Sequence, residues 1–219
     1  FITTASDSRQ KAINLARDYQ DWSRIDRAFE QARYAAEIEM RRMDIDAGKM
    51  EQYQKLLSML FYPQLSLRAH PEVLAANRRG QPALWAYAIS GDYPILLVNI
   101  AEPEEVTILR DLLRAHAYWR TRGLLIDLVI LNEKETGYSQ DVHDRIFQLL
   151  LHTNNDTWLN RRGGIFILRK DSMSQEDLTL LRTAARVIID GSSSSLEEQI
   201  ANAAQPPMRL PLFQTVEGE

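Results

Sequence analysis

The stretch from residue 84 to residue 133 constrains the fold most, because it is expected to form a strand, a helix and a second strand in succession. Apolar runs at 95–100 and 124–131 lie near its ends, and the second run is rich in β-branched residues. Runs of this kind suit strands that are covered on both faces, as in a parallel sheet. Between them, a helix is predicted to begin at Glu102–Pro103 and to end near Gly123, with proline in its first turn and glycine at its carboxyl cap.

Further strands and helices continue this alternation to about residue 190. Apolar runs at 165–168 and 187–189 predict a third and a fourth strand, and each follows a segment with helical spacing. Strands that alternate with helices indicate a parallel sheet with right-handed crossovers. The sequence therefore predicts an α/β fold, with a three-layer domain over residues 71–205 and a mostly parallel sheet of about four strands.

The first 70 residues predict a different arrangement, in which antiparallel helices are joined by short connections. Apolar stripes at helical spacing run along 25–43 and 50–60. At the other end of the chain, residues 206–219 are punctuated by proline and are expected to form an extended linker. The predicted organisation is thus a helical segment (1–70), an α/β domain (71–205) and a C-terminal linker (206–219).

Composition excludes several classes of function. The net charge of −4 leaves no basic excess that would indicate nucleic-acid binding. The chain has no cysteine, which excludes disulfides and thiolate metal sites, and its histidines form no tight metal-binding pair. His116 lies on the apolar face of its predicted helix and is expected to be a hydrogen-bonded core residue. No apolar run approaches the roughly 20 residues of a membrane helix. The nucleotide-binding motifs GxGxxG and GxxxxGK[ST] are missing as well. Together, these observations lead us to expect neither a metal nor a cofactor.

Two places in the sequence could bind a ligand. The turn Ser90–Gly91–Asp92 could surround one with backbone N–H groups and the Asp92 carboxylate, although a tight turn with local hydrogen bonds is the commoner explanation. Parallel sheets bind ligands beyond the carboxyl ends of their strands. There, Asn99, Asn132 and Glu133 could hydrogen-bond sugar hydroxyls, with ordinary loop polarity as the alternative.

Aromatic and paired acidic residues also suggest carbohydrate chemistry, but each has a simpler explanation. Five aromatic side chains could stack on sugar faces, although packing is commoner in helices and strands: Trp85, Tyr87, Tyr118, Trp119 and Trp158. The pairs Glu104–Glu105 and Glu197–Glu198 lie at helix starts, where the helix dipole accounts for them. No catalytic residue can be assigned from these patterns.

Long segments of the chain resemble the cyclic β-1,2-glucan synthases, in the same order. They are SRQKAINLARDYQD (8–21), IDRAFEQARYAAEIEMRRM (25–43), YQKLLSMLFYPQLSLRA (53–69), LWAYAISGDYPILLVNI (84–100), LLRAHAYWRTRGLLIDLVILNE (112–133), GYSQD (137–141) and QPPMRLPLF (205–213). Two positions depart from the family pattern: Ala88 stands where glycine is expected, and Tyr93 where leucine is common. Both departures leave the predicted turn and strand intact.

The resemblance implies a piece of a very large bacterial inner-membrane protein. In that family, an N-terminal glycosyltransferase region elongates a β-1,2-glucan from UDP-glucose, and a middle region closes the ring by transglycosylation. A C-terminal module that resembles cellobiose phosphorylase adjusts chain length with phosphate. The chain resembles the connector that precedes this module, and no catalytic residue of the family falls on any of its positions.

The resemblance therefore implies a soluble, non-catalytic scaffold on the cytoplasmic side of the membrane. Its expected partners are the flanking β-sandwich and (α/α)6 barrel domains of the same polypeptide, with β-1,2-glucan as a further candidate and no nucleic acid or inserted membrane segment. The alternative is a carbohydrate- or nucleotide-binding α/β domain with its own site at the carboxyl ends of the strands.

Overall fold

The computed structural model describes residues 3–134, 139–192 and 195–203 of the 219-residue chain. It divides into two compact units, Phe1–Lys49 and Met50–Glu219. The domain boundaries predicted near residues 70 and 205 stay predictions, and the predicted linker 206–219 lies outside the described residues.

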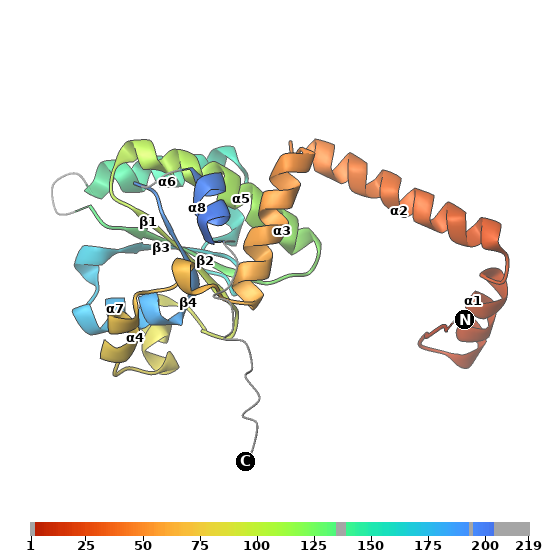
Figure 1. The fold of residues 1–219 in the computed structure, drawn as a ribbon, viewed down its shortest axis with the longest axis horizontal. Coiled ribbons are helices and arrows are strands. Elements are labelled where there is room, and N and C mark those ends of the chain that lie inside the picture. The colour runs from red at the N-terminus through yellow and green to blue at the C-terminus, as the bar shows by residue number, and fades with distance from the viewer. Residues whose placement is uncertain (1–2, 135–138, 193–194, 204–219) are drawn as a thin grey trace, which may run out of the picture. The chain divides into compact units, whose positions relative to one another are not determined.

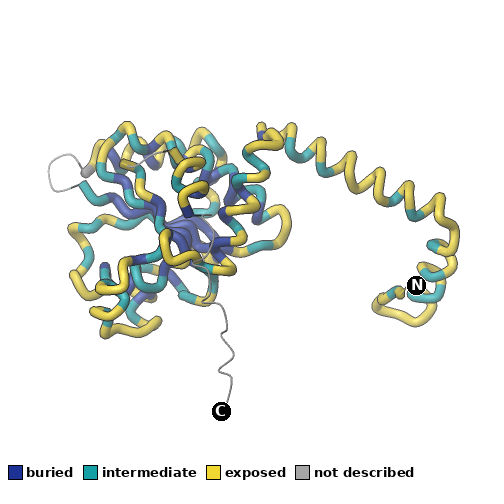
Figure 2. Tube along the Cα trace, viewed as in Figure 1, coloured by how far each residue is buried: buried dark blue, intermediate teal, exposed yellow. Residues whose placement is uncertain are grey.

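The first unit contains helices α1 (Arg9–Asp18) and α2 (Trp22–Arg42). Each helix is capped at its start: the side chain of Ser8 accepts a hydrogen bond from the Lys11 backbone, and that of Asp21 from the Ser23 backbone. Figure 2 shows both helices mostly exposed, and neither contains a buried residue. The antiparallel packing predicted for the N-terminal helices stays a prediction.

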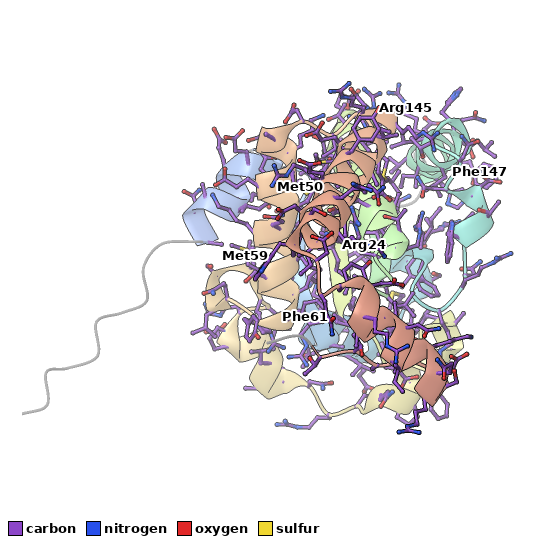
Figure 3. All side chains as sticks on the ribbon, turned by 90° about the vertical axis from the view of Figure 1, so that its right-hand side faces the viewer. Arg24, Met50, Met59, Phe61, Arg145 and Phe147 are labelled. Carbon is purple, nitrogen blue, oxygen red and sulfur yellow. The ribbon has the colours of Figure 1, made fainter. Side chains whose placement is uncertain are left out.

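Helix α3 (Ala47–Phe61) runs from the end of the first unit into the second. Tyr53, Leu56, Met59 and Leu60 are buried on one side of it, where the predicted apolar stripe lies. Figure 3 labels Met59 and, near the end of the helix, Phe61, which is 50% exposed.

The second unit is built on four strands, β1 (Ile95–Ile100), β2 (Asp127–Asn132), β3 (Ile165–Arg169) and β4 (Ala185–Asp190). They form one sheet in the order β3-β2-β1-β4, and all neighbouring strands are parallel. The predicted α/β fold with a parallel sheet of four strands is therefore confirmed.

Helices α5 (Val106–Thr121) and α6 (Ser139–His152) connect β1 to β2 and β2 to β3, while α7 (Gln175–Ala184) precedes β4. Because β4 lies on the opposite side of β1 from β2 and β3, a right-handed crossover places α7 on the other face of the sheet. Figure 1 shows this arrangement: α5 and α6 cover one face, and α7 lies with α4 (Pro71–Ala76) on the other.

The central strands, β1 and β2, are buried on both faces, as their continuous apolar runs predicted. On the α7 face, Leu97, Val129 and Phe166 pack in one cluster with Leu178 and Leu181 of the helix. The intervening strand residues are equally inaccessible to solvent: Leu96, Val98, Leu128 and Ile130. Figure 2 shows this core as the dark-blue centre of the unit.

Several boundaries differ from the sequence expectation. The second strand begins at Asp127 instead of Leu124, because the end of α5 continues through Gly123 at φ 72° and the Leu124 N–H donates to Trp119 O at 3.0 Å. The fourth strand is longer than the predicted 187–189, since β4 spans Ala185–Asp190. The remaining helices are α8 (Leu196–Ala203) and the short 3-10 segments η1 (Leu65–Leu67), η2 (Gln81–Tyr87), η3 (Pro103–Glu105), η4 (Asp156–Trp158) and η5 (Lys170–Ser172).

Candidate functional site

The predicted ligand-binding residues lie at two different edges of the sheet. Asn99, Asn132 and Glu133 lie at the carboxyl edge, where the parallel strands end. Asp92 precedes β1 and lies at the amino edge, where the strands begin. The structure therefore does not bring Asp92 together with the other three.

At the carboxyl edge, the polar side chains bind one another. Arg182 Nη2 of α7 donates to Glu133 Oε1 at 2.6 Å. Lys134 Nζ lies 2.5 Å from Glu102 Oε1, and the Lys134 backbone N–H donates to Asn132 Oδ1 at 3.0 Å. These contacts give Asn132 and Glu133 a structural role in joining the loops that follow β1 and β2 to α7.

The strand order changes direction between β1 and β4, and open parallel sheets usually bind their ligand at the carboxyl end of such a switch point. Backbone fills that place here. The Gly191 N–H donates to Asn99 O at 2.9 Å, and a Cβ atom on Gly191 would lie 2.8 Å from the same oxygen. The half-buried Asn99 side chain keeps one acceptor, Oδ1, without a hydrogen-bond partner among the described residues.

A second polar network lies at the amino edge. Gln81 Nε2, at the start of η2, donates to Ser90 O at 2.8 Å and to Asp92 Oδ1 at 3.1 Å. Arg162 Nη2, from the loop before β3, donates to Asp92 Oδ2. The same guanidinium lies 5.5 Å from the centre of the Tyr93 ring. Three segments that are distant in the sequence thus meet at Asp92.

Local backbone geometry makes this meeting possible. Segment η2 ends at Ala88, which adopts a left-handed conformation with φ 61°. Glycine adopts that conformation with less strain, which explains why glycine is the residue expected at this position in the family pattern. Gly91 has φ 73°, and a Cβ atom there would lie 2.8 Å from Gln81 Cγ. A glycine at residue 91 therefore lets Gln81 lie across the turn.

Two cavities open beside this network and share Gln81 and Asp92. The first has a volume of about 440 Å³ and is also lined by Tyr93, Pro94 and Ile95, among others. The second has a volume of about 390 Å³ and is also lined by Trp85, Ala88, Ile89, Ser90 and Arg162. Both volumes lie in the range of small-molecule sites, which is about 300–1,000 Å³.

Asp127 lies at the same edge but is fully buried. Its Oδ1 atom accepts a hydrogen bond from the Gly163 N–H at 2.8 Å, while Oδ2 has no partner among the described residues. Burial raises the pKa of Asp127 to about 6, against the opposing effects of the Gly163 N–H and the Arg162 charge. The carboxylate of Asp92 adds a smaller upward contribution.

His116 is a hydrogen-bonded core residue, as predicted. Its Nε2 atom lies 2.7 Å from Ile126 O, and Arg120 Nη1 lies 2.5 Å from its Nδ1. Since the guanidinium can only donate, the ring is neutral with its proton on Nε2. Burial, and then the Arg120 charge, lower the pKa of His116 to about 3. Arg120 also donates to Asn155 Oδ1 at 2.8 Å and covers the Trp158 ring at 4.4 Å.

The structure separates the five aromatic candidates. Trp119 is buried, and the Tyr87 hydroxyl donates to Asp177 Oδ2 at 2.9 Å, so both have structural roles. The rings of Trp158 and Tyr118 each lie under a guanidinium, that of Arg120 at 4.4 Å and that of Arg122 at 5.2 Å. Trp85 is 62% exposed at the rim of the second cavity, and its Nε1 atom donates to Ser90 O at 3.3 Å.

Metal ligands do not gather in the described part of the chain, where no three or more His, Asp or Glu side chains are placed to hold an ion. Among the same residues, every helix is too short or too polar to cross a membrane.

Comparison with known proteins supports the resemblance seen in the sequence. No family model matches the chain. The chain is 31% identical over 207 residues to the cyclic beta-(1,2)-glucan synthase NdvB of Rhizobium meliloti (strain 1021). The match covers 93% of this chain but only 7% of that relative. The chain is thus similar, along nearly its whole length, to one segment of a much longer synthase.

Proposed function

We propose that the chain is a non-catalytic connecting segment of a cyclic β-1,2-glucan synthase. The observation that carries this proposal is the coverage of the match, which includes 93% of the chain and 7% of the synthase. Most of a synthase would lie outside such a segment. Glucosyl transfer from UDP-glucose, ring closure and phosphorolytic trimming are accordingly assigned to other regions of the full-length protein.

The contacts of the acidic side chains support this assignment. Hydrolysis of a glycosidic bond usually involves two carboxyl groups that both reach the substrate. Asp127 has the raised pKa of a general acid, but its side chain is fully buried and cannot touch a bound sugar. Glu133 is paired with Arg182, and Glu102 with Lys134. Asp127 is thus out of reach of a substrate, and Glu133 and Glu102 are held in ion pairs that join loops of the fold.

In the full-length protein, the segment would hold its neighbours in register. The proposed neighbours are a β-sandwich domain and an (α/α)6 barrel domain of the same polypeptide, on the cytoplasmic side of the inner membrane. The exposed aromatic residues of α2 support a role in contacts with other domains, since Trp22 is 75%, Phe29 68% and Tyr34 66% exposed.

Product analysis of the purified chain tests this proposal. The chain is incubated with UDP-glucose, and separately with β-1,2-linked gluco-oligosaccharides with and without phosphate, and the sugars are separated by chromatography and mass spectrometry. We expect the same sugars as in a protein-free control, while circular dichroism shows a folded chain. Any new glucan, cyclic product or glucose phosphate that increases with protein concentration would contradict the proposal.

A second candidate function is a carbohydrate- or nucleotide-binding domain with its site at the carboxyl edge. The Oδ1 acceptor of Asn99 favours it, because this buried atom has no hydrogen-bond partner among the described residues and such an atom calls for an explanation. Calorimetry with β-1,2-glucan oligomers, glucose phosphate and UDP-glucose would detect such binding. The substitutions Asn99→Ala and Asn132→Ala should then abolish the signal, and an unchanged signal would remove this site.

A further inference from the structure

We propose that the amino edge of the sheet binds a neutral gluco-oligosaccharide, with Trp85 as the stacking surface and Gln81, Asp92 and Arg162 as the hydrogen-bonding groups. The site lies at the opposite edge of the sheet from Asn99, Asn132 and Glu133. The identity of the sugar, β-1,2-linked glucose, rests on the proposed function, whereas the geometry of the site does not.

The stacking surface is Trp85. Within η2, Leu84 is buried in the core at 2% exposure, whereas the neighbouring Trp85 is 62% exposed. The hydrogen bond from its Nε1 to Ser90 O, at 3.3 Å, ties the edge of the indole to the turn. A tryptophan that is polar at one edge and open over its apolar face suits a ligand with both characters, such as a pyranose ring.

The hydrogen-bonding groups lie next to this surface and are fixed before any ligand arrives. Gln81 donates a hydrogen bond to Asp92 Oδ1, and Arg162 donates one to Asp92 Oδ2. The side chains of Arg162 and Asp92 are nevertheless 63% and 49% exposed. A guanidinium has five N–H donors and a carboxylate about four acceptor positions, so both retain capacity for sugar hydroxyls, which donate and accept.

The charge at this place favours a neutral ligand. Arg162 and Asp92 form an ion pair, so the second cavity offers donors and acceptors without net charge from these two groups. In the first cavity, Arg68 donates to Thr183 O at 2.8 Å, and Arg186 contributes to the lining. Phosphate or a nucleotide sugar is therefore the competing ligand class that an experiment must separate.

The paired cavities favour an oligosaccharide over a single sugar. They have volumes of about 440 and about 390 Å³ and meet at Gln81 and Asp92. Side chains that line both cavities can contact two successive glucose units. We therefore expect affinity to rise from glucose to a β-1,2-linked disaccharide and trisaccharide.

Isothermal titration calorimetry on the whole chain tests the site. We expect β-1,2-linked gluco-oligosaccharides to bind, and Trp85→Ala to weaken binding roughly tenfold by removing the aromatic face. Trp85→Phe should keep part of the affinity. Trp22→Ala is the matched control, because Trp22 is 75% exposed and belongs to the other unit, so it should bind like the unaltered chain.

Three results would overturn the proposal: no heat of binding at millimolar oligosaccharide, equal affinities for the Trp85→Ala and Trp22→Ala variants, or tighter binding of inorganic phosphate or UDP-glucose than of the glucan. Circular dichroism of each variant confirms that the fold persists. These results are separate from the test of the proposed function. A chain that binds no sugar and forms no product would leave the connecting role in place, whereas product formation would refute that role whatever the affinity.

Discussion

The opposed titrations of His116 and Asp127 predict an unusual dependence of stability on pH. Both side chains are fully buried, and both exchange protons differently in the folded and unfolded states. The pH is lowered from about 7 to about 5, a range in which the protonation of both side chains changes the stability of the fold. The measured quantity is the free energy of unfolding.

For His116, the folded pKa of about 3 lies below the ordinary 6.5, so the unfolded state binds more protons. Stability is therefore complete above 6.5 and is lost as the pH falls toward 3. One pKa unit corresponds to about 1.4 kcal/mol, so acidification from about pH 7 to about pH 5 costs about 2 kcal/mol through His116.

For Asp127, the folded pKa of about 6 lies above the ordinary 3.8, so the folded state binds more protons. Its burial destabilises the fold above pH 6, and that penalty is relieved as the pH falls through 6 toward 3.8. The same acidification should return about 1 kcal/mol through Asp127. In the unaltered chain, the two contributions therefore oppose each other.

Urea unfolding of variants at both pH values separates the two terms. Between about pH 7 and about pH 5, Asp127→Asn should lose about 1 kcal/mol more stability than the unaltered chain, and His116→Gln about 2 kcal/mol less. His70→Gln is the control, because that side chain is 71% exposed and should leave the pH dependence unchanged. Equal pH dependences in all four proteins, or shifts of the opposite sign, would refute the reasoning.

Two further predictions concern packing and backbone strain, and both are read from chemical unfolding at neutral pH. Leu97→Ala, in the centre of the sheet, should lower the free energy of unfolding by about 2–5 kcal/mol. Leu151→Ala, at a side chain that is 41% exposed, should lower it by less than about 1 kcal/mol. Similar losses for the two variants would contradict the assigned core. Gly163→Ala should destabilise the fold more than Gly123→Ala, although both residues have positive φ. A Cβ atom at residue 163 would lie 2.9 Å from Leu125 Cβ, whereas a Cβ atom at residue 123 would meet no neighbouring atom within 4 Å. Equal losses of stability would contradict the tight contact at Gly163.

Local patterns predicted the architecture because the central strands, β1 and β2, are buried on both faces. A short apolar run between two helical segments, such as 95–100, is typical of a strand in a parallel sheet. Strand β1 accordingly has the predicted bounds. The helical stripe that ends at His116 also faces the core, and the placement of that histidine is confirmed. The strand order could not be predicted, because periodicity shows which face of an element is apolar but not which strands are neighbours.

The candidate site was harder to predict, because it depends on contacts between distant segments. Asp92 was singled out from its turn, but its partner Arg162 lies 70 positions away. Nothing near Trp85 in the sequence distinguishes an exposed tryptophan from a packed one such as Trp119. The environment of Asp127 was not predicted either: the residue lies within the apolar run 124–131, but periodicity does not show that Gly163 comes to lie beside its carboxylate.

Hydrogen–deuterium exchange with and without a β-1,2-linked gluco-oligosaccharide tests most directly whether the amino edge is the functional surface of this segment. We expect the sugar to protect backbone amides in residues 81–93 and 161–163 and to leave those around 132–134 and 170–173 unchanged. Protection confined to the carboxyl edge, or no protection at saturating sugar, would contradict a sugar-binding site at the amino edge.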